Sequence, residues 1–590
     1  MRRSAEKNIA MPNALLIYPE QPPTFWGVDF ALDIFGFKAM HLPLGLITIA
    51  SMFPPGFDVR LVDMNVSTLE DADLEWADMA FTSAMITQRF SLQSVIERCG
   101  RAGVPVVAGG PYPTTFHAEI EGVDHFVLDE AEEIFPEFLR DLENGTARAV
   151  YREPRKPDVT RTPVPRFDLV DMKSYSSMSV QFSRGCPFDC EFCDIIKLFG
   201  QVTRTKSPDQ ILEEFDTLYR LGWRGPVFLV DDNFIGNARE ALKLLPAVVE
   251  WQKSRGYPFA LFTEASVNLA RMDKLMDTMI EAGFNTVFLG LETPNPEALL
   301  KTKKRQNTDK RNENYLFDAV RKIQRKGMQV LGGFIVGLDS DGEGVFDAQI
   351  EFVQEAGIPV APIYMLTALK GTDMYERLKA ENRLLEDVVT HNATTLNFEP
   401  EMPRETLIEG YKRVIATLYD PTLENYFKRC LTLFENLEPV PHLWKPMSGN
   451  EIYAGIMRVR QQLSAAQVPA FSKFIAKVSR EHPRMLSYAI YLAGLGYHFE
   501  KFTRQQIALR DFEDFLAAEL KLLTRAVSGD VPDAEDVRSW RRESFARARA
   551  RYESIPDDFR YLGDGVDEAL QSFFGAVNAL TNEPARSALA

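Results

Sequence analysis

Short apolar segments alternate with helix-like segments along this chain of 590 residues, and this alternation constrains the fold more than any other feature. Helical patterns such as SLQSVIERCGRAG separate the apolar segments of residues 1–150. Strands joined by crossover helices predict a parallel, doubly wound sheet, whose ligands bind outside the carboxyl ends of the strands. The predicted strands are NALLIY (from Asn13), FDVRLVD (from Phe57), DMAFTSAM (from Asp78), VPVVAGG (from Val104) and DHFVLD (from Asp124).

A second series of strand candidates follows, again with a helical pattern between each pair. Six such units predict a partial (β/α) barrel, whose chemistry lies on the loops after the strands. A cysteine-rich segment directly follows the first of these strands, which is a functional position. The candidates are SMSVQFS (from Ser177), PVFLVDD (from Pro226), FALFTEAS (from Phe259), TVFLGLE (from Thr286), QVLGGFIVG (from Gln329) and PVAPIYML (from Pro359).

The chain is too long for one hydrophobic core, and its patterns predict an α/β protein of several domains. We expect a Rossmann-like domain over residues 1–150 and a linker over 151–175, where Glu153–Asp168 contains four prolines. The barrel is expected over residues 176–385. After that the strand signal stops and apolar residues recur at helical spacing, so residues 386–590 are predicted to form a helical domain.

Charge and hydropathy exclude several classes of function. A net charge of −17 and a pI near 5.1 argue against nucleic acid as a partner, and we expect no local basic run that would reverse this. The N-terminus lacks the pattern of a signal peptide. The segment MLSYAIYLAGLGYHF is roughly two-thirds of the length that a membrane-spanning helix needs. We expect a cytoplasmic protein without a membrane span, with peripheral association left open.

Three of the five cysteines, Cys186, Cys190 and Cys193, lie within GCPFDCEFCDI. Iron–sulfur clusters are usually held by four thiolates, so three thiolates on a four-iron cluster leave one iron open to another ligand. The other two cysteines, Cys99 and Cys430, are isolated and are expected to be core residues.

The alternative to a cluster is structural zinc, which requires a fourth ligand. No histidine lies close to the cysteine-rich segment, and Asp189 or Asp194 would complete a zinc site poorly. Phe192, directly before the last cysteine, has no role at zinc.

This pattern of C-x3-C-x-aromatic-C after the first strand of a partial barrel resembles the signature of radical S-adenosylmethionine (AdoMet) enzymes. The resemblance implies a [4Fe–4S] cluster on Cys186, Cys190 and Cys193 whose open iron binds AdoMet. Electron transfer then yields methionine and a 5′-deoxyadenosyl radical.

The other AdoMet positions of the family fall on the strand ends that follow. The resemblance implies that Asp231 and Asp232 in VDDNF hold the methionine amine, and that Glu292 in LGLETPN reaches the ribose or amine. Gly333 and Gly337 in GGFIVGL would pass close to the adenine, and Phe192 belongs to the cofactor-binding signature.

The doubly wound domain in front resembles a cobalamin-binding domain. Ser83 in FTSAM and the paired Gly109 and Gly110 in VVAGGPYP occupy positions that contact the cobalamin nucleotide tail in that family. The D-x-H-x-x-G motif that supplies a histidine to cobalt is absent; His41 and His117 are the nearest alternatives, and core or surface roles are expected for both. Asp129 stands where the family often has glycine.

Residues 1–430 as a whole resemble the subgroup that includes the hopanoid C-2 methylase, on VQFSRGCPFDCEFCDI, GPVFLVDDNF and GLETPNPEAL. This implies a cobalamin-dependent methyltransferase that acts on an unactivated carbon of a lipid-like or polycyclic small molecule, through the 5′-deoxyadenosyl radical and methylcobalamin. An electron donor such as flavodoxin or ferredoxin would be its partner. The alternatives are a radical cyclisation or rearrangement without methyl transfer, and a corrinoid or redox sensor, against which the AdoMet positions argue.

Overall fold

The computed structural model describes residues 13–152, 155–385, 396–444, 447–527, 534–555 and 565–581. The chain forms two compact units. One comprises Met1–Gln21 and Trp26–His498, and the other comprises Pro22–Phe25 and Phe499–Ala590. Within the described ranges, no helix has the length and apolar character to cross a membrane.

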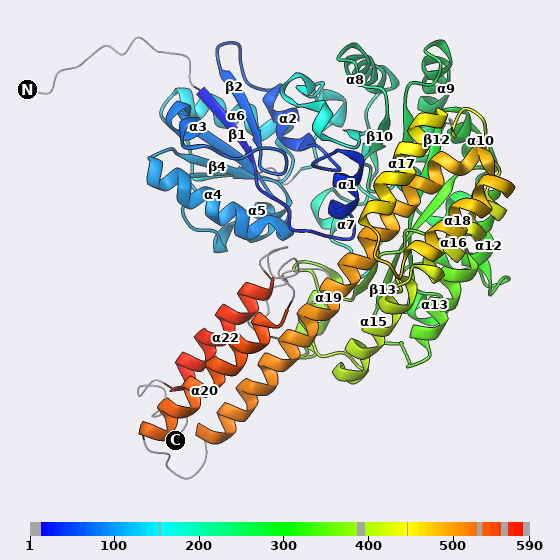
Figure 1. Cartoon of the computed structure of the whole chain (residues 1–590). Helices are drawn as coiled ribbons and strands as arrows, with labels where there is room; N and C mark the ends of the chain where they lie inside the picture. The colour runs from blue at the N-terminus through cyan, green and yellow to red at the C-terminus, as the bar shows by residue number, and fades with distance from the viewer. Residues whose placement is uncertain are drawn as a thin grey trace, which may run out of the picture. The chain divides into compact units, whose positions relative to one another are not determined.

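The first unit begins with a six-stranded, wholly parallel sheet in the order β2-β1-β3-β4-β5-β6. Helices lie on both of its sides (Figure 1). Its strands are β1 (Asn13–Tyr18), β2 (Asp58–Asp63), β3 (Met79–Ser83), β4 (Val106–Gly109), β5 (His125–Leu128) and β6 (Val150–Arg152). The helices of this region are α1 (Asp29–Phe35), α2 (Leu44–Ala50), α3 (Asp71–Trp76), α4 (Arg89–Ala102), α5 (Pro111–Phe116) and α6 (Ala131–Glu143).

Both faces of this sheet are buried, which explains the continuous apolar runs in its sequence. Leu15 and Ile17 point to a core shared with α3 and α4, whereas Ala14 and Leu16 point to a second core shared with α2 and α6. Successive side chains of a strand alternate between faces, so one run fills both cores.

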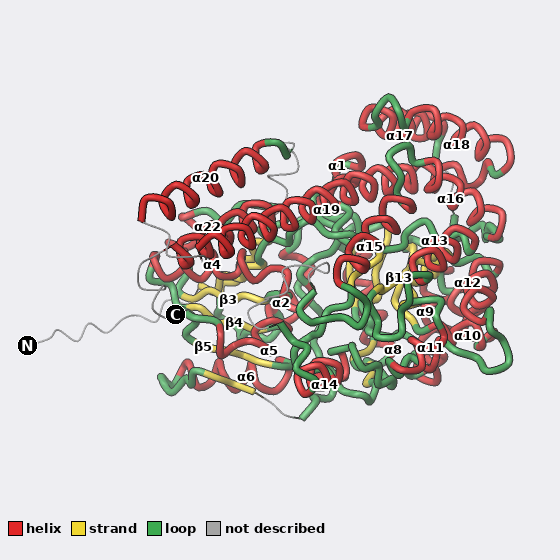
Figure 2. Tube along the Cα trace, turned by 90° about the horizontal axis from the view of Figure 1, so that it is seen from below, coloured by secondary structure: helices red, strands yellow, loops and turns green. Residues whose placement is uncertain are grey.

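The second sheet is also parallel and runs in the order β14-β13-β12-β11-β10-β7. β7 and β14 lie at opposite edges and do not pair, so the barrel is partial. Helices such as α10 and α12 flank these strands (Figure 2). The strands are β7 (Met178–Val180), β10 (Pro226–Leu229), β11 (Ala260–Ala265), β12 (Phe284–Glu292), β13 (Gln329–Val336) and β14 (Ile363–Met365). The helices are α7 (Ile195–Leu198), α8 (Pro208–Arg220), α9 (Ala238–Ser254), α10 (Asp273–Glu281), α11 (Pro296–Lys301), α12 (Tyr315–Arg325) and α13 (Val345–Glu355).

Aromatic side chains line the inner face of the partial barrel. The rings of Phe228 and Phe262 stack with centroids 4.7 Å apart, and alternate along their strands with residues buried under the barrel helices. The ring centroid of His41 lies 5.1 Å from that of Phe228, and the ring centroid of Trp26 lies 4.7 Å from that of Phe288, in an edge-to-face arrangement. Side chains from the segment before α2 therefore fill part of the barrel interior.

Helices dominate the described residues after β14. The first unit contains α14 (Asp373–Ala380), α15 (Arg404–Leu418), α16 (Glu424–Asn436), α17 (Gly449–Gln462) and α18 (Val468–Glu481). α19 (Leu486–Val527) begins in the first unit and ends in the second, which also contains α20 (Ala534–Glu553) and α22 (Gly565–Thr581). The second unit has a core of its own that includes Phe512, Leu516 and Phe573.

All eleven strands predicted from the sequence are present, so the expected fold class is confirmed. Sequence analysis missed β6, and also the antiparallel pair β8 (Ser183–Arg184) and β9 (Arg204–Thr205). These strands are two or three residues long, which is too short for a periodic signal. Residues 153 and 154 of the predicted linker lie outside the described residues, and the predicted domain boundaries stay predictions.

Candidate functional site

The cysteine-rich segment is a loop whose base is closed by β8 and β9. The backbone N–H of Cys186 donates to the carbonyl of Gly200 at 3.2 Å. Gly185 has a φ of +91°, and a Cβ at this position would lie 2.7 Å from the same carbonyl. Glycine before the first cysteine is thus required by this close approach, because other residues rarely adopt such a φ.

The three thiols lie in a largely buried setting. Burial raises the pKa of Cys186, and raises that of Cys193 to about 12. The side-chain amide of Asn233 lies 3.7 Å from Cys186 Sγ, and that of Gln306 lies 3.4 Å from Cys190 Sγ. These residues would hold a cluster as thiolates, and the two side-chain amides would donate hydrogen bonds to the cysteine sulfurs.

Three thiols on one short loop suit a cluster, because thiolate is the ligand that iron–sulfur clusters require. Within the described part of the chain, no group of three or more His, Cys, Asp or Glu side chains could hold a single metal ion. This also holds for the three thiols of the loop, so it does not separate zinc from a cluster.

The polar residues after β10 hold this loop in place. Asp231 is 1% exposed, and its two carboxylate oxygens accept hydrogen bonds from Phe182 N at 2.8 Å and Ser183 Oγ at 2.7 Å. Asp232 accepts from Gly185 N at 2.8 Å through one oxygen. Burial raises the pKa of Asp231 to about 7 and that of Asp232 to about 6. Contact of either residue with AdoMet stays a prediction. Asp232 is the better candidate, because only one of its carboxylate oxygens accepts a hydrogen bond from the loop.

Glu292 ends β12 in a strained conformation. Its φ is +65°, which is unusual for a residue with a side chain, and the register of β12 against β13 shifts between Gly290 and Glu292. The carboxylate accepts from Lys304 Nζ at 2.6 Å. A Cβ on Gly290 would lie 2.5 Å from Glu292 Oε1, so the glycine leaves room for this pair.

Lys304 was not predicted from the sequence. Burial alone would lower its pKa, but the carboxylate of Glu292 and the thiol of Cys190 raise it by more, so the pKa of Lys304 is raised. Its Nζ lies 5.8 Å from the ring centroid of Phe192. A buried cation thus faces the cysteine loop, where it can offset the negative charge of a thiolate-bound cluster.

The two predicted glycines, Gly333 in β13 and Gly337 directly after it, leave room for protein side chains. A Cβ on Gly333 would lie 2.7 Å from the ring of Phe288. Gly337 has a φ of +94°, and a Cβ there would lie 2.9 Å from the side chain of Leu407. Their contact with adenine stays a prediction.

Glu264 on β11 is a second residue that sequence analysis missed. Burial, with the neighbouring Asp232 and Asp231, raises the pKa of Glu264 to about 8, and Lys304 opposes this. Its strand was predicted correctly, and the signal was a lone acidic residue near the end of an apolar strand. The barrel therefore carries a cluster of carboxyl groups at the strand ends closest to the cysteine loop.

A cavity of about 290 Å³ opens at the carboxyl ends of β3, β4 and β5. Ser83, Gly109 and Gly110, the three residues predicted to contact cobalamin, all line it. Apolar side chains such as Met52, Phe81 and Phe135 extend its wall between the sheet and the helices. The lining is mostly apolar and includes several polar groups, which suits the planar base and polar backbone of a nucleotide tail.

The cavity wall also fits a bound group in detail. The hydroxyl of Thr82 is buried there without a hydrogen-bond partner among the described atoms. A Cβ on Gly110, whose φ is +89°, would lie 2.3 Å from Ser83 Oγ, and one on Gly109 would lie 2.7 Å from the carbonyl of Val127. An unpaired buried hydroxyl and a side-chain-free rim are consistent with a cofactor that approaches the backbone closely.

Asp129, in place of the family's glycine, keeps a glycine-like backbone. Its φ is +65°, a conformation that aspartate tolerates better than most residues. Its carboxylate pairs with Arg152 at 3.1 Å and lies 3.8 Å from Lys156. The departure from the family pattern therefore preserves the loop and adds ion pairs at the cavity rim.

The cavity reaches the base of the cysteine loop. Arg184 and Phe199, on either side of the three cysteines, line it together with residues of the first sheet. The carboxylate of Glu130, before α6, pairs with Arg184 at 2.8 Å and with Arg204 at 2.8 Å. A buried ion-pair network thus joins the first sheet to both strands that close the cysteine loop.

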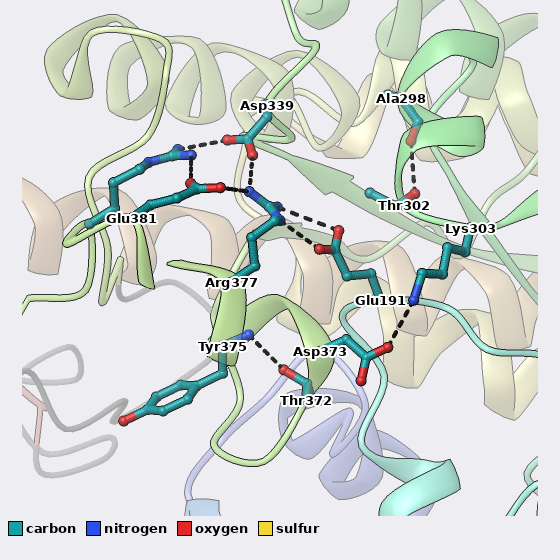
Figure 3. Close-up of polar contacts among 11 residues, drawn as sticks. Glu191, Ala298, Thr302, Lys303, Asp339, Thr372, Asp373, Tyr375, Arg377 and Glu381 are labelled. Carbon is teal, nitrogen blue, oxygen red and sulfur yellow. Dashed lines mark hydrogen bonds and ion pairs between the residues drawn. The ribbon is translucent and has the colours of Figure 1, made fainter. Parts of the chain in front are cut away.

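α14 also contacts this loop (Figure 3). Arg377 Nε lies 2.6 Å from the carboxylate of Glu191, the residue after Cys190, and Arg377 also pairs with Asp339 at 2.9 Å. Asp373 pairs with Lys303 at 2.8 Å and with Lys197 at 3.0 Å. Sequence analysis predicted none of these contacts, because the partners lie far apart in the chain.

Neither candidate histidine is among the residues that line the cavity. Burial lowers the pKa of His41 to about 4, and its Nδ1 lies 3.2 Å from Ser177 Oγ among the aromatic rings of the barrel. His117 packs with its ring 5.8 Å from that of Phe126. His41 is half-buried against the aromatic rings of the barrel, and the expected core or surface role of both histidines stays a prediction.

The family profiles that match the chain follow the same division. The profile of the B12 binding domain matches residues 35–139, and that of the Radical SAM superfamily matches residues 180–353. An uncharacterized methyltransferase of Synechocystis is 47% identical over 412 residues, which are 69% of this chain and 76% of the relative. The chain belongs to the cobalamin-binding radical AdoMet family. The hopanoid C-2 methylase of Rhodopseudomonas palustris, a further member, is 32% identical over 71% of this chain and 79% of its own length.

Solved structures show the same fold at low identity. The cobalamin-dependent AdoMet radical enzyme OxsB, with aqua-cobalamin and AdoMet bound, has a TM-score of 0.55 at 13% identity and covers 97% of this chain and 85% of its own. The methyltransferase TsrM of Kitasatospora setae, with cobalamin and a [4Fe–4S] cluster bound, has a TM-score of 0.50 at 14% identity over 82% of this chain and 98% of its own. A domain of unknown function (DUF4070) matches residues 372–510.

These findings establish the cofactors and the class of enzyme. Family membership assigns a [4Fe–4S] cluster, AdoMet and cobalamin to this enzyme, a cobalamin-dependent radical AdoMet methyltransferase. Cys186, Cys190 and Cys193 would hold the cluster, and the cavity at Ser83 and Gly110 would hold the corrinoid.

Proposed function

We propose that this enzyme methylates an unactivated carbon of a lipid-like or polycyclic small molecule. When bound, the cluster and AdoMet supply a carbon-centred radical, and the corrinoid supplies the methyl group. Each turnover replaces one substrate C–H bond with C–CH3 and consumes two AdoMet molecules and two electrons. It releases S-adenosylhomocysteine, methionine and 5′-deoxyadenosine, with the substrate hydrogen ending in 5′-deoxyadenosine.

The observation that carries this proposal is the shared wall of the corrinoid cavity. Ser83 and Gly110 come from the first sheet, whereas Arg184 and Phe199 come from the loop that bears the cysteines. Methyl transfer to a carbon radical requires the radical source and the methyl donor to be near each other, because such a radical is short-lived and reacts over contact distance. Glu130, Arg184 and Arg204 hold the two halves of this site together.

Exposed apolar side chains support a lipid-like substrate. Met85 and Phe90 follow β3 at the edge that carries Ser83, and Val202 lies on the cysteine loop before β9; all three are exposed. These three side chains add exposed apolar surface to the segments that flank Ser83 and Phe199, which line the cavity. The 32% identical hopanoid C-2 methylase has a product of this class in its name.

The test is anaerobic turnover of the reconstituted enzyme with AdoMet deuterated in its methyl group and a lipid extract of the host. We expect a product that gains the labelled methyl group, with S-adenosylhomocysteine and 5′-deoxyadenosine in a ratio near one. A product without the label, formed with 5′-deoxyadenosine alone, would reject methyl transfer in favour of cyclisation or rearrangement.

The control is a variant in which Cys186, Cys190 and Cys193 are all alanine. It should lose bound iron and form no 5′-deoxyadenosine, while its first domain still binds cobalamin, because the cavity lies mainly in that domain. Continued formation of 5′-deoxyadenosine would show that these cysteines do not hold the cluster.

A further inference from the structure

A strongly basic segment interrupts this acidic protein. Residues 301–311, KTKKRQNTDKR, contain six lysines and arginines and one aspartate in a chain whose net charge is −17. The expectation that the chain has no local basic run was therefore wrong at this segment. It extends from the end of α11 through a short 3-10 turn at Arg305–Asn307 toward α12.

The basic segment lies directly against the cysteine loop. The carbonyl of Thr302 accepts a hydrogen bond from the backbone N–H of Glu191 at 3.0 Å. Gln306 contacts Cys190 Sγ, as described above, and Lys303 is tied to α14 through Asp373 (Figure 3). Arg305 is adjacent in sequence to Gln306, whose side chain touches a cysteine that would hold the cluster.

The charges of this segment divide into paired and unpaired groups. Lys301, Lys303 and Lys304 form ion pairs with Glu297, Asp373 and Glu292. Arg305, Lys310 and Arg311 are exposed and form no ion pair within the ranges that the structure describes. Their charge is thus available to a partner.

An apolar residue lies next to these charges. Leu300, at the end of α11, is 51% exposed, although leucine is usually buried. Protein interfaces typically combine an apolar centre with a polar rim, and Leu300 can supply an apolar contact beside these charges.

We infer that Leu300, Arg305, Lys310 and Arg311 form the docking surface for a small acidic protein that carries one electron at low potential. This inference rests on the proposed function, which requires electrons at the cluster. Positive charges on the segment that contacts the cysteine loop would steer an acidic carrier to this face against the net repulsion between two acidic proteins. The transfer moves one electron from the reduced carrier to the oxidised cluster, and no atom is exchanged.

The test compares wild type with the variant Arg305→Glu, Lys310→Glu, Arg311→Glu, both reconstituted with cluster. Binding of reduced flavodoxin is measured by calorimetry, and AdoMet cleavage to 5′-deoxyadenosine is driven by flavodoxin or by dithionite. In the variant we expect flavodoxin affinity and flavodoxin-driven cleavage to fall at least about tenfold at low salt, and dithionite-driven cleavage to stay within twofold. The wild-type affinity should weaken with added salt.

The matched control reverses three exposed basic residues on α17 and α18, in the variant Arg458→Glu, Arg460→Glu, Lys473→Glu, which has the same net charge. This control should match wild type in flavodoxin binding and in AdoMet cleavage driven by flavodoxin or by dithionite. Equal losses in both variants would attribute the effect to bulk charge and overturn the proposal, as would unchanged flavodoxin binding in the first variant. Equal losses with flavodoxin and dithionite would place the effect on the cluster, not on docking. A wild type that binds flavodoxin but cleaves no AdoMet with dithionite would contradict the proposed function and leave the docking surface supported.

Discussion

Arg377 of α14 holds both carboxylate oxygens of Glu191, at 2.6 Å and 3.4 Å, and Glu191 follows Cys190 directly. The backbone N–H of Met374 also donates to the carbonyl of Glu191 at 3.0 Å. α14 lies at the start of the region that matches a domain of unknown function, residues 372–510. This region therefore has a structural role in fixing the loop that carries the cysteines.

Replacing Arg377 tests that role. In Arg377→Gln, the carboxylate of Glu191, whose side chain is 11% exposed, is left without its cation, which should cost about 1–3 kcal/mol of stability. We expect a lower melting temperature of the apoprotein and less iron bound after reconstitution, with Arg377→Lys restoring part of both. Arg413→Gln removes an exposed ion pair with Asp347 and should change neither. Full iron content in Arg377→Gln would show that α14 is not needed to hold the loop.

Replacing Asp231 and replacing Asp232, the two aspartates after β10, should have different effects. Asp231→Ala removes the acceptor for Phe182 N and Ser183 Oγ, so it should mainly lower stability and cluster content. Asp232→Ala should weaken AdoMet binding by about 1–3 kcal/mol if its second oxygen holds the methionine amine. Calorimetric titration of AdoMet against each cluster-loaded variant measures this. Unchanged AdoMet affinity in Asp232→Ala would limit the residue to its bond with Gly185.

Gly110 lies at the rim of the cavity that we propose for the corrinoid, where a side chain would not fit. In Gly110→Ala, the new Cβ would collide with Ser83 Oγ, so we expect cobalamin binding to fall at least about tenfold while iron content is unchanged. Gly103→Ala is a control for a positive φ in open space: Gly103 has φ +72° and ψ 23°, whereas Gly110 has φ +89° and ψ −177°. Bound cobalamin is read from the absorbance spectrum of the purified protein. Equal losses in both variants would attribute the effect to backbone strain.

The buried carboxyl of Glu264 predicts a pH dependence of stability. Its pKa is raised to about 8 in the folded protein, compared with 4.5 in the unfolded chain, so the folded state retains the proton over this range and the unfolded state does not. The contribution of Glu264 to stability is present below pH 4.5 and is lost as the pH rises toward 8. Glutamine does not ionise, so Glu264→Gln should not lose stability in this way. The free energy of unfolding of the apoprotein in urea, variant minus wild type, should therefore be larger at pH 8.5 than at pH 5.5. The same difference at both pH values would contradict the raised pKa.

The local patterns of the sequence determined the fold class, the strands and the cysteine loop. Alternation with period two and short apolar runs depend only on neighbouring residues, so β1 to β5 and the strands of the partial barrel were predicted. The spacing of Cys186, Cys190 and Cys193 indicated a cluster for the same reason, since all its ligands lie on one short segment.

The tertiary structure alone decided what holds and surrounds that loop. Glu191 meets Arg377, which lies 186 positions away along the chain, and Glu264 becomes part of the site only because the barrel brings its strand beside β10. Lys304 was overlooked within a basic segment until the fold buried it against Glu292. Charge, burial and contact between distant residues depend on how the elements pack, and no local period in the sequence records that packing.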